Sequence, residues 1–256
     1  MTALTDGPLL GFDTETTGVN PFRDRIVTAA LVGRGPAGTF ERTWLIDPGV
    51  EIPEQAAAIH GVSTEHAREH GMHPATALAQ ISAELTAAFT HQVPVVAFNA
   101  SFDLTIIEAE LERHGLPTIG ERLGRPLSPV IDPLVLDRAL DRYRRGKRKL
   151  VDLCEVYGVE GTGRLHTADV DVAATLDVLA AQARKHPELA GEDLEQLHLW
   201  QAGQHRAWAQ NFNAWRASQG LEGPGASLHW PLSKPHVGDE KDHTAPAPLP
   251  PVATVA

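Results

Sequence analysis

The sequence predicts an α/β protein built on a mixed sheet with helices on both faces. Apolar and β-branched runs joined by short turns near the N-terminus indicate an antiparallel meander. Two later apolar runs each lead directly into a helical pattern, which is typical of parallel βα units. The remaining part of the domain shows helical periodicity, so helices complete it.

The strands are expected where short apolar runs end in turn residues. The first run, Leu9–Phe12, carries Asp13 and Glu15 at its end and stops at a Thr-Thr-Gly turn. The other expected strands lie at 25–32, 39–46, 93–99 and 130–133. Helical patterns occupy 54–60, 74–90, 102–114, 134–142, 149–157 and 167–185.

Three segments are expected along the chain. Residues 1–187 form the domain, and 188–219 form a helical extension in which Trp200, Trp208 and Trp215 share a stripe that we expect to pack on the domain. Residues 220–256 are rich in Pro, Gly, His and Ala without apolar periodicity, which predicts a disordered tail.

Composition limits the classes of function. The 256 residues carry a net charge of -11, which excludes indiscriminate nucleic-acid binding but allows a local basic patch. Residues 138–149 form such a patch, with seven Lys or Arg residues against one Asp. The single cysteine, Cys154, cannot form an intrachain disulfide, so we expect a cytoplasmic protein. No signal peptide or membrane-spanning run is evident, so no membrane partner is expected.

Asp13 and Glu15 form the first candidate site. Residues i and i+2 of a strand point to the same face, so the two carboxylates repel each other unless a cation lies between them. Hard oxygen ligands favour Mg²⁺ or Mn²⁺ over Zn²⁺. The alternative is a solvated pair of acids at a strand end.

Further polar residues follow the later strands. Asn99, Phe102 and Asp103 stand where the fourth strand passes into a helix, and His166 precedes a helix whose first turns carry Asp169 and Asp171. Taken singly, each acid has an alternative explanation as a helix cap or a dipole partner.

The three groups together resemble the motifs of the DEDDh, or DnaQ-like, 3'-5' exonuclease family, which includes proofreading subunits of bacterial DNA polymerases. The resemblance covers about residues 7 to 185 and includes Ile59-His60-Gly61-Val62. It implies a ribonuclease H-like fold with a five-stranded mixed sheet. The family pattern has four residues between His and Asp, which selects Asp171 over Asp169.

The resemblance also implies the chemistry. Asp13, Glu15, Asp103 and Asp171 would hold two divalent cations, Mg²⁺ or Mn²⁺, and His166 would accept a proton from the attacking water. Substrate contacts are expected from one further set of residues: Thr16, Thr17, His60, Asn99, Phe102, Arg144, Arg145 and Lys147.

The expected activity is 3'-5' exonucleolytic hydrolysis of single-stranded or frayed DNA, releasing nucleoside 5'-monophosphates. The alternatives are an exoribonuclease acting on short RNA or RNA 3' ends and a non-catalytic adaptor of a polymerase or repair complex. The pentapeptide Gln196–Trp200 resembles a sliding-clamp binding peptide, although it falls in a segment that is expected to be helical. A polymerase or clamp is therefore a possible partner besides nucleic acid.

Overall fold

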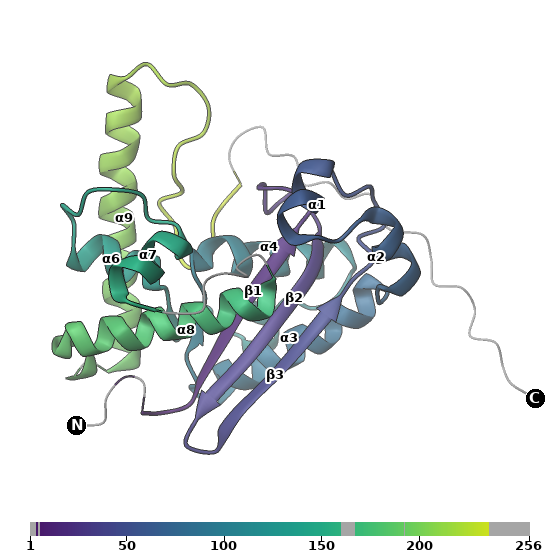
Figure 1. Cartoon of the computed structure of the whole chain (residues 1–256), viewed down its shortest axis with the longest axis horizontal. Helices are drawn as coiled ribbons and strands as arrows, with labels where there is room; N and C mark the ends of the chain where they lie inside the picture. The colour runs from purple at the N-terminus through teal and green to yellow at the C-terminus, as the bar shows by residue number, and fades with distance from the viewer. Residues whose placement is uncertain (1–3, 5, 160–166, 192, 236–256) are drawn as a thin grey trace, which may run out of the picture.

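β1 (Leu9–Thr16) is the central strand of a five-stranded sheet in the computed structural model, which describes residues 4, 6–159, 167–191 and 193–235 (Figure 1). On one side, β1 pairs antiparallel with β2 (Ile26–Gly35), and β2 pairs antiparallel with β3 (Gly38–Leu45). On the other side it pairs parallel with β4 (Val95–Val96), which pairs parallel with β5 (Val130–Ile131). The order β3-β2-β1-β4-β5 confirms the expected mixed sheet.

The helices lie close to the expected positions, with two additions. The full set of helices in the described part of the chain is α1 (Glu54–His60), α2 (Thr64–His70), α3 (Pro74–Thr90), α4 (Ala100–Arg113), α5 (Ile119–Leu123), α6 (Pro133–Leu140), α7 (Leu150–Tyr157), α8 (Ala168–Lys185), the 3-10 helix η2 (Pro187–Gly191) and α9 (Leu194–Ser218). The sequence did not predict α2 and α5, because seven and five residues are too short to show an apolar period. Their start signals are local: Ser63 caps α2, and Thr118 forms a capping box with Glu121 in α5.

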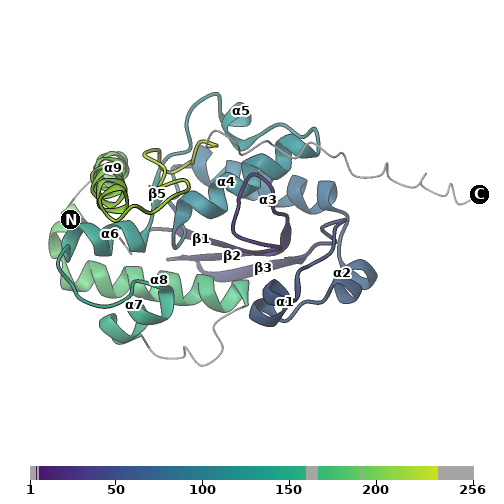
Figure 2. The ribbon, with the colours of Figure 1, turned by 90° about the horizontal axis from the view of Figure 1, so that it is seen from above.

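The sheet is covered on both faces (Figure 2). One core lies between the sheet and α3 and α4, and contains Phe12, Leu31, Leu78, Ile81 and Leu104. The other core lies between the sheet and α8, and contains Leu9, Val32, Val96, Val172 and Leu176. Both faces of the parallel strands are therefore buried, as their uninterrupted apolar sequences require.

α9 packs on the domain by a different face from the one expected. Its buried side chains include Leu197, His198 and Gln201, whereas Trp208 is half-buried and Trp215 is 53% exposed. Trp200 is also exposed, at 38%, so the expectation that the tryptophans pack on the domain was wrong for Trp200 and Trp215. The C-terminal half of α9 projects away from the rest of the fold (Figure 1).

The chain turns back after α9. Trp230 is buried with its ring 5.0 Å from the ring of His198, and the backbone N–H of Ser233 donates to the hydroxyl of Thr105 at 2.9 Å. Residues 220–235, which were expected to be disordered, thus cover part of the core, because Trp230 and Leu232 supply the apolar contacts that hold them there. The rest of the expected tail lies outside the described residues. Within the described part of the chain, no helix combines the length and apolarity that crossing a membrane requires.

Candidate active site

Three carboxylates converge at the carboxyl end of β1. Asp13 and Glu15 come from β1, and Asp171 comes from the first turns of α8. One ligand oxygen from each lies within 4.8 Å of the other two, and all three residues are half-buried. The structure thus brings together the two acids of the strand motif and the acid that the His-Asp spacing selects. Among the described residues, this is the group of acids that can jointly hold a cation.

Asp103 lies beside these acids but has a different set of partners. It belongs to α4 and is 4% exposed. Its Oδ1 accepts the backbone N–H of Thr14 at 3.0 Å and the hydroxyl of Thr14 at 2.7 Å. Thr14 separates Asp13 from Glu15 in the sequence, so these two bonds hold α4 directly against the strand that carries both acids. Asp103 is accordingly absent from the 4.8 Å group.

The site is strongly electronegative without a cation. Burial and then the charge of Asp103, with smaller contributions from Glu15 and Asp171, raise the pKa of Asp13 well above its ordinary value. Burial and the charges of Asp171 and Asp103 raise the pKa of Glu15 to about 7. Burial also raises the pKa of Asp103 to about 7, although its bonds with Thr14 act in the opposite direction. A divalent cation among these oxygens would remove this penalty, so the donor set fits a hard metal ion.

A close approach of α8 to β1 places Asp171 beside Asp13. A Cβ added to Gly11 of β1 would overlap the side chain of Val172, which follows Asp171 in α8. Only a glycine at this position lets the helix lie so near the strand. The backbone N–H of Asp171 donates to the carbonyl oxygen of Thr167 at 3.0 Å, which fixes the first turn of α8.

Asp132 accepts hydrogen bonds from the backbone at the start of α4, a role that the sequence did not predict. It is 1% exposed, and its carboxylate accepts the backbone N–H groups of Asn99 and Ala100, both at 3.0 Å, and of Leu134 at 2.9 Å. These bonds hold Asn99 in a left-handed conformation, with φ 61° and ψ 45°, immediately before α4. The available signal was an Asp directly before the Pro that begins a helix, a common capping pattern.

A pocket of about 280 Å³ opens next to the acids. Its lining includes Glu15, His60, Thr167 and Asp169. His60 is 8% exposed; its Nδ1 accepts the backbone N–H of Val62 at 3.2 Å, and its Nε2 has no hydrogen-bond partner among the described residues. Burial lowers the pKa of His60, so the ring is neutral near pH 7 and presents an Nε2–H donor.

The remaining expected substrate residues near the acids have varied environments. Asn99 is exposed at the start of α4, and Phe102 is half-buried against the core. The hydroxyl of Thr16 donates to the carbonyl oxygen of Gly18 at 2.6 Å. Thr17 is buried, and its hydroxyl accepts the backbone N–H of Arg25 at 3.0 Å, so this side chain stabilises the loop after β1. His166, the expected proton acceptor, lies outside the described residues.

The basic run divides into two kinds of residue. Arg144 pairs with Asp137, which is fully buried, at 2.9 Å, and Arg148 pairs with the same carboxylate. Arg145 and Lys147 are exposed. Arg144 is therefore part of a structural ion-pair cluster, to which the exposed Arg145 and Lys147 do not belong.

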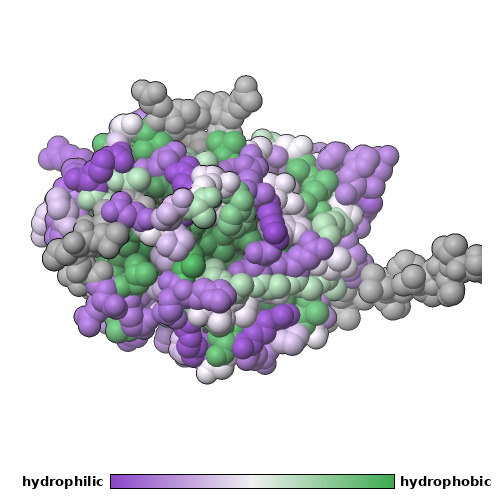
Figure 3. All heavy atoms as spheres, turned by 90° about the horizontal axis from the view of Figure 1, so that it is seen from below, coloured by the Kyte–Doolittle hydropathy of each residue, from purple (hydrophilic) through white to green (hydrophobic). Residues whose placement is uncertain are grey.

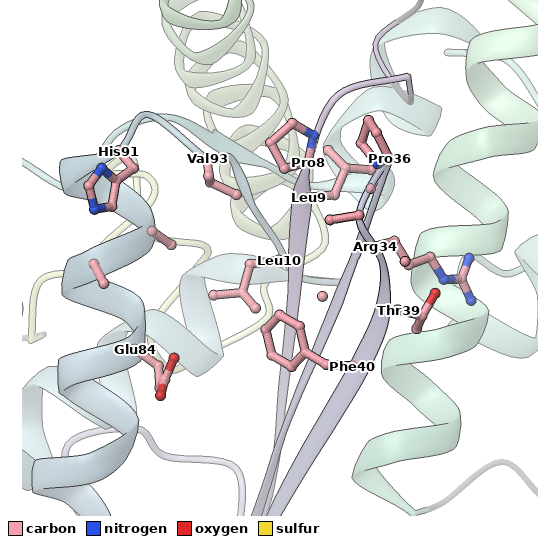
Figure 4. Close-up of a pocket in the computed structure, with 16 residues that line it drawn as sticks. Pro8, Leu9, Leu10, Arg34, Pro36, Thr39, Phe40, Glu84, His91 and Val93 are labelled. Atoms are coloured by element: carbon pink, nitrogen blue, oxygen red, sulfur yellow. The ribbon is translucent and has the colours of Figure 1, made fainter.

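The most voluminous of the described pockets lies far from this chemistry. It measures about 560 Å³ and is formed by the start of β1, the β2–β3 hairpin and the C-terminal part of α3 (Figure 4). Its lining includes Leu10, Phe40 and Val93, with Glu84 and His91 at the side formed by α3. Figure 3 views the molecule from this end of the sheet and shows apolar residues in a hollow bordered by polar ones. No acid cluster of the kind found at the other end of β1 lines this pocket.

The fold and the acid cluster define a class of protein. A mixed α/β sheet that gathers carboxylates at the carboxyl ends of its parallel strands has the features of a metal-dependent hydrolase. The family model described as Exonuclease (RNase_T) matches residues 10–179, so the chain belongs to this exonuclease family. The resemblance to DEDDh, DnaQ-like 3'-5' exonucleases is thereby confirmed.

Two sets of known proteins are similar to this chain. DNA polymerase III PolC-type of Streptococcus sanguinis is 31% identical over 174 residues, covering 63% of this chain and 11% of that protein. The corresponding protein of Streptococcus thermophilus is 31% identical over 174 residues, covering 67% and 11%. The chain thus spans about a tenth of the length of these relatives.

Solved structures of Exonuclease I share the fold. The E. coli enzyme in complex with a dA16 oligonucleotide aligns with a TM-score of 0.61 and 20% identity, covering 72% of this chain and 42% of that one. A zinc ion bound form of the E. coli enzyme in complex with single-stranded DNA aligns with a TM-score of 0.62 and 20% identity, covering 78% and 43%. These similarities confirm the ribonuclease H-like architecture.

Proposed function

We propose that this chain is a divalent-metal-dependent 3'-5' exonuclease that removes nucleoside 5'-monophosphates from single-stranded or frayed DNA. The observation that carries the proposal is the convergence of Asp13, Glu15 and Asp171 within 4.8 Å beside the buried Asp103. All four acids of the family pattern are present at one place in an exonuclease-family fold. A non-catalytic adaptor would have no need to keep such an unfavourable group of charges.

The acids have different roles in this proposal. Asp13, Glu15 and Asp171 supply the oxygens for two Mg²⁺ or Mn²⁺ ions, and Asp103 supports the second ion while its bonds with Thr14 fix its position. Bound divalent ions would activate the attacking water and neutralise charge that develops on the scissile phosphate. His166 would accept the proton from that water, which is the role that the family pattern gives to this histidine.

The terminal nucleotide enters the pocket beside Glu15. His60 is suited to donate its unpartnered Nε2–H to an oxygen of the nucleotide, because it is neutral and already held by Val62. Thr16 and Asn99 border the acids through β1 and the start of α4, and Phe102 offers a ring to the terminal base. Thr17 acts through the loop that it stabilises.

DNA is the proposed substrate because the similar proteins named above are DNA polymerases and Exonuclease I bound to DNA. A polymerase is the protein partner most consistent with the first group. The clamp-like peptide gains no support, since Leu197 and His198 are buried within α9. A cytoplasmic location remains a prediction from the single cysteine.

The test is end-labelled hydrolysis by the whole chain. Pure protein is incubated with 3'- and 5'-labelled DNA and RNA strands in Mg²⁺, Mn²⁺ or EDTA. We expect release of the 3' label first, dependence on the metal, and at least a hundredfold loss in Asp13→Ala and Asp171→Asn. The matched control is Asp177→Asn, which removes another acid of α8 that pairs with Arg34 at the surface.

Each outcome separates one element of the proposal. Activity that survives both EDTA and Asp13→Ala would reject the mechanism. Release of the 5' label first would reject the polarity. Faster hydrolysis of RNA than of DNA would replace the proposed substrate by the exoribonuclease alternative.

A further inference from the structure

A basic groove is lined by residues of α6, of α9 and of the segment that follows α6. It measures about 230 Å³. Three arginines line it, and no acidic residue does. The lining residues are Arg138, Ala139, Arg142, Arg148, Gln204, Ala207, Trp208 and Asn211. Burial lowers the pKa of Arg138 to about 10, so this arginine stays charged at neutral pH. In a chain of net charge -11, Arg138 and Arg142 give this groove a local positive charge, whereas Arg148 is already paired with Asp137.

Aromatic rings continue from this groove along α9. The guanidinium carbon of Arg138 lies 3.6 Å from the ring centroid of Trp208. On α9, Trp208 stacks with Phe212 at 5.3 Å and an interplanar angle of 14°, and Phe212 stacks with Trp215 at 5.8 Å and 30°. We call Trp208, Phe212 and Trp215 the aromatic ladder. It begins at the half-buried Arg138 and ends at Trp215, which is 53% exposed.

The ladder stands on the part of α9 that projects from the domain (Figure 1). The packed face of this helix segment is a different one: Asn213 bonds the carbonyl oxygen of Ala226 at 2.9 Å, and His205 bonds that of Ser227 at 2.9 Å. The returning chain therefore covers one side of α9 and leaves the ring of Trp215 exposed. Trp208 and Phe212 are half-buried, so Trp215 is the ring of the ladder that is open to a stacking partner.

The basic loop, residues 141–149 between α6 and α7, runs from the groove to an apolar cluster next to the start of α4. Arg142, at the start of this loop, lines the groove, and Arg148 pairs with Asp137, which fixes the loop before α7. At the other end of this loop, Leu150 begins α7 and packs in the same apolar cluster as Phe98. Phe98 directly precedes Asn99 at the start of α4. Exposed basic side chains such as Arg145 and Lys147 lie between these two ends.

We propose that the aromatic ladder and the basic groove form a second binding site for single-stranded nucleic acid, which holds the strand on the 5' side of the terminal nucleotide. Arginines pair with phosphates, and an open aromatic ring stacks on an unpaired base, whereas duplex bases are already stacked. This inference rests on the proposed exonuclease function, because that function places a strand at the acids.

The test measures binding as a function of strand length. The whole chain in EDTA is titrated with fluorescent DNA strands of about 4 and about 20 nucleotides. Trp215→Ala should weaken binding of the long strand about tenfold and leave the short strand unchanged, because one stacking contact is lost. Trp215→Phe should keep most of the affinity, since phenylalanine also stacks.

Trp200→Ala is the matched control. Trp200 is another partly exposed tryptophan of α9, 38% exposed, but its pocket contains Glu188 and no basic residue. We expect its substitution to leave binding of both strands unchanged. Hydrolysis of the short strand in Mg²⁺ should be equal in the wild type and in all three variants.

The possible failures are distinguishable. If Trp215→Ala binds the long strand as tightly as the wild type, the ladder is not a nucleic-acid site, whatever the activity. Equal losses in Trp200→Ala and Trp215→Ala would also overturn the inference. If the wild type hydrolyses neither strand, the proposed exonuclease function fails, and the binding titration still decides whether the ladder holds nucleic acid.

Discussion

Thr14 donates both its backbone N–H and its hydroxyl to one oxygen of Asp103, although 89 positions separate the two residues in sequence. The residues on either side of Thr14 in the chain, Asp13 and Glu15, form the 4.8 Å carboxylate group together with Asp171. One short stretch of β1 therefore both supplies two acids and positions a third. The arrangement joins α4, β1 and α8 at the site.

Removing the Thr14 hydroxyl should impair this positioning. Thr14→Val keeps the backbone bond and the size of the side chain but loses the 2.7 Å bond. A hydrogen bond to a charged group contributes about 1.5–3 kcal/mol, so we expect kcat to fall about tenfold or more. In the wild type, the hydroxyl bond stabilises the charged form of Asp103 and so lowers its pKa. Without this bond, the pKa of Asp103 should rise further, and the acidic limb of the pH–rate profile should move to higher pH.

Thr14→Ser is the control for this experiment. Serine retains a hydroxyl that can donate to Asp103, so its profile should resemble that of the wild type. A Thr14→Val variant with wild-type kcat and an unmoved acidic limb would show that the hydroxyl has no part in the reaction.

The raised pKa values predict how pH affects stability without metal. Glu15 and Asp103 have folded-state pKa values of about 7, above their ordinary values of 4.5 and 3.8. The folded state thus binds more protons than the unfolded state between these limits. Stability from these groups is fully present below about pH 4 and is lost as pH rises through about 7. We expect the Tm in EDTA to fall between pH 5 and pH 8.

Added metal should reverse this loss. Mg²⁺ at about a hundred times its Kd should raise the Tm at pH 8 by on the order of 5 °C, and less at pH 5, where protons compete for the oxygens. Asp13→Asn removes one repelling charge, so it should raise the Tm in EDTA at pH 8 and reduce the response to Mg²⁺. Scanning fluorimetry measures both effects. A wild-type Tm in EDTA that is constant or rises from pH 5 to pH 8 would contradict the assignment of these shifts.

The sequence predicted which acids converge better than it predicted the groups that hold them in place. The two-residue period of a strand was enough to place Asp13 and Glu15 on one side, and the spacing from His166 selected Asp171. Thr14 could not be found in this way, because its partner depends on how α4 crosses the sheet. The cap formed by Asp132 depends on the adjacency of β4 and β5, which sequence spacing does not determine.

The C-terminal region shows the same limit. A tryptophan stripe at helical spacing predicted one packed face of α9, but tertiary contacts selected the face with Leu197 and Gln201. The choice follows from β5, which is an edge strand whose backbone groups need partners. His198 accepts the N–H of Val130 at 3.1 Å, and Gln201 accepts the N–H of Asp132 at 2.8 Å. Polar residues therefore had to face the sheet.

This pairing predicts that α9 belongs to the folded domain. The Gln201 amide also donates to the carbonyl oxygen of Val130 at 3.1 Å, and the side chain is fully buried. Gln201→Leu leaves the N–H of Asp132 and the carbonyl of Val130 unpaired, so we expect a loss of about 2–4 kcal/mol in the free energy of unfolding. Urea denaturation measures it.

A truncated chain gives the second measurement. Residues 1–187 without α9 should unfold at a lower urea concentration than the full chain, because the edge of β5 is then exposed. If the truncated chain matches the full chain in stability, the proposed boundary after residue 187 is a true domain boundary, and α9 is an appendage.

The basic loop should respond in two different ways to substitution. Arg145 and Lys147 are exposed and make no ion pair within the described chain, so Arg145→Ala/Lys147→Ala should weaken DNA binding and lower the salt slope by about 1.4, as expected for two lost phosphate contacts on a single strand. The free energy of unfolding of this double variant should stay within about 0.5 kcal/mol of that of the wild type. Arg144→Ala should instead lower stability by about 2 kcal/mol, because Asp137 is fully buried and would keep, among the described residues, Arg148 and the Tyr157 hydroxyl at 3.1 Å as partners. Binding titrations at several salt concentrations, together with urea denaturation, separate the two effects. A steep salt slope in the double variant would show that the strand takes another path to the acids.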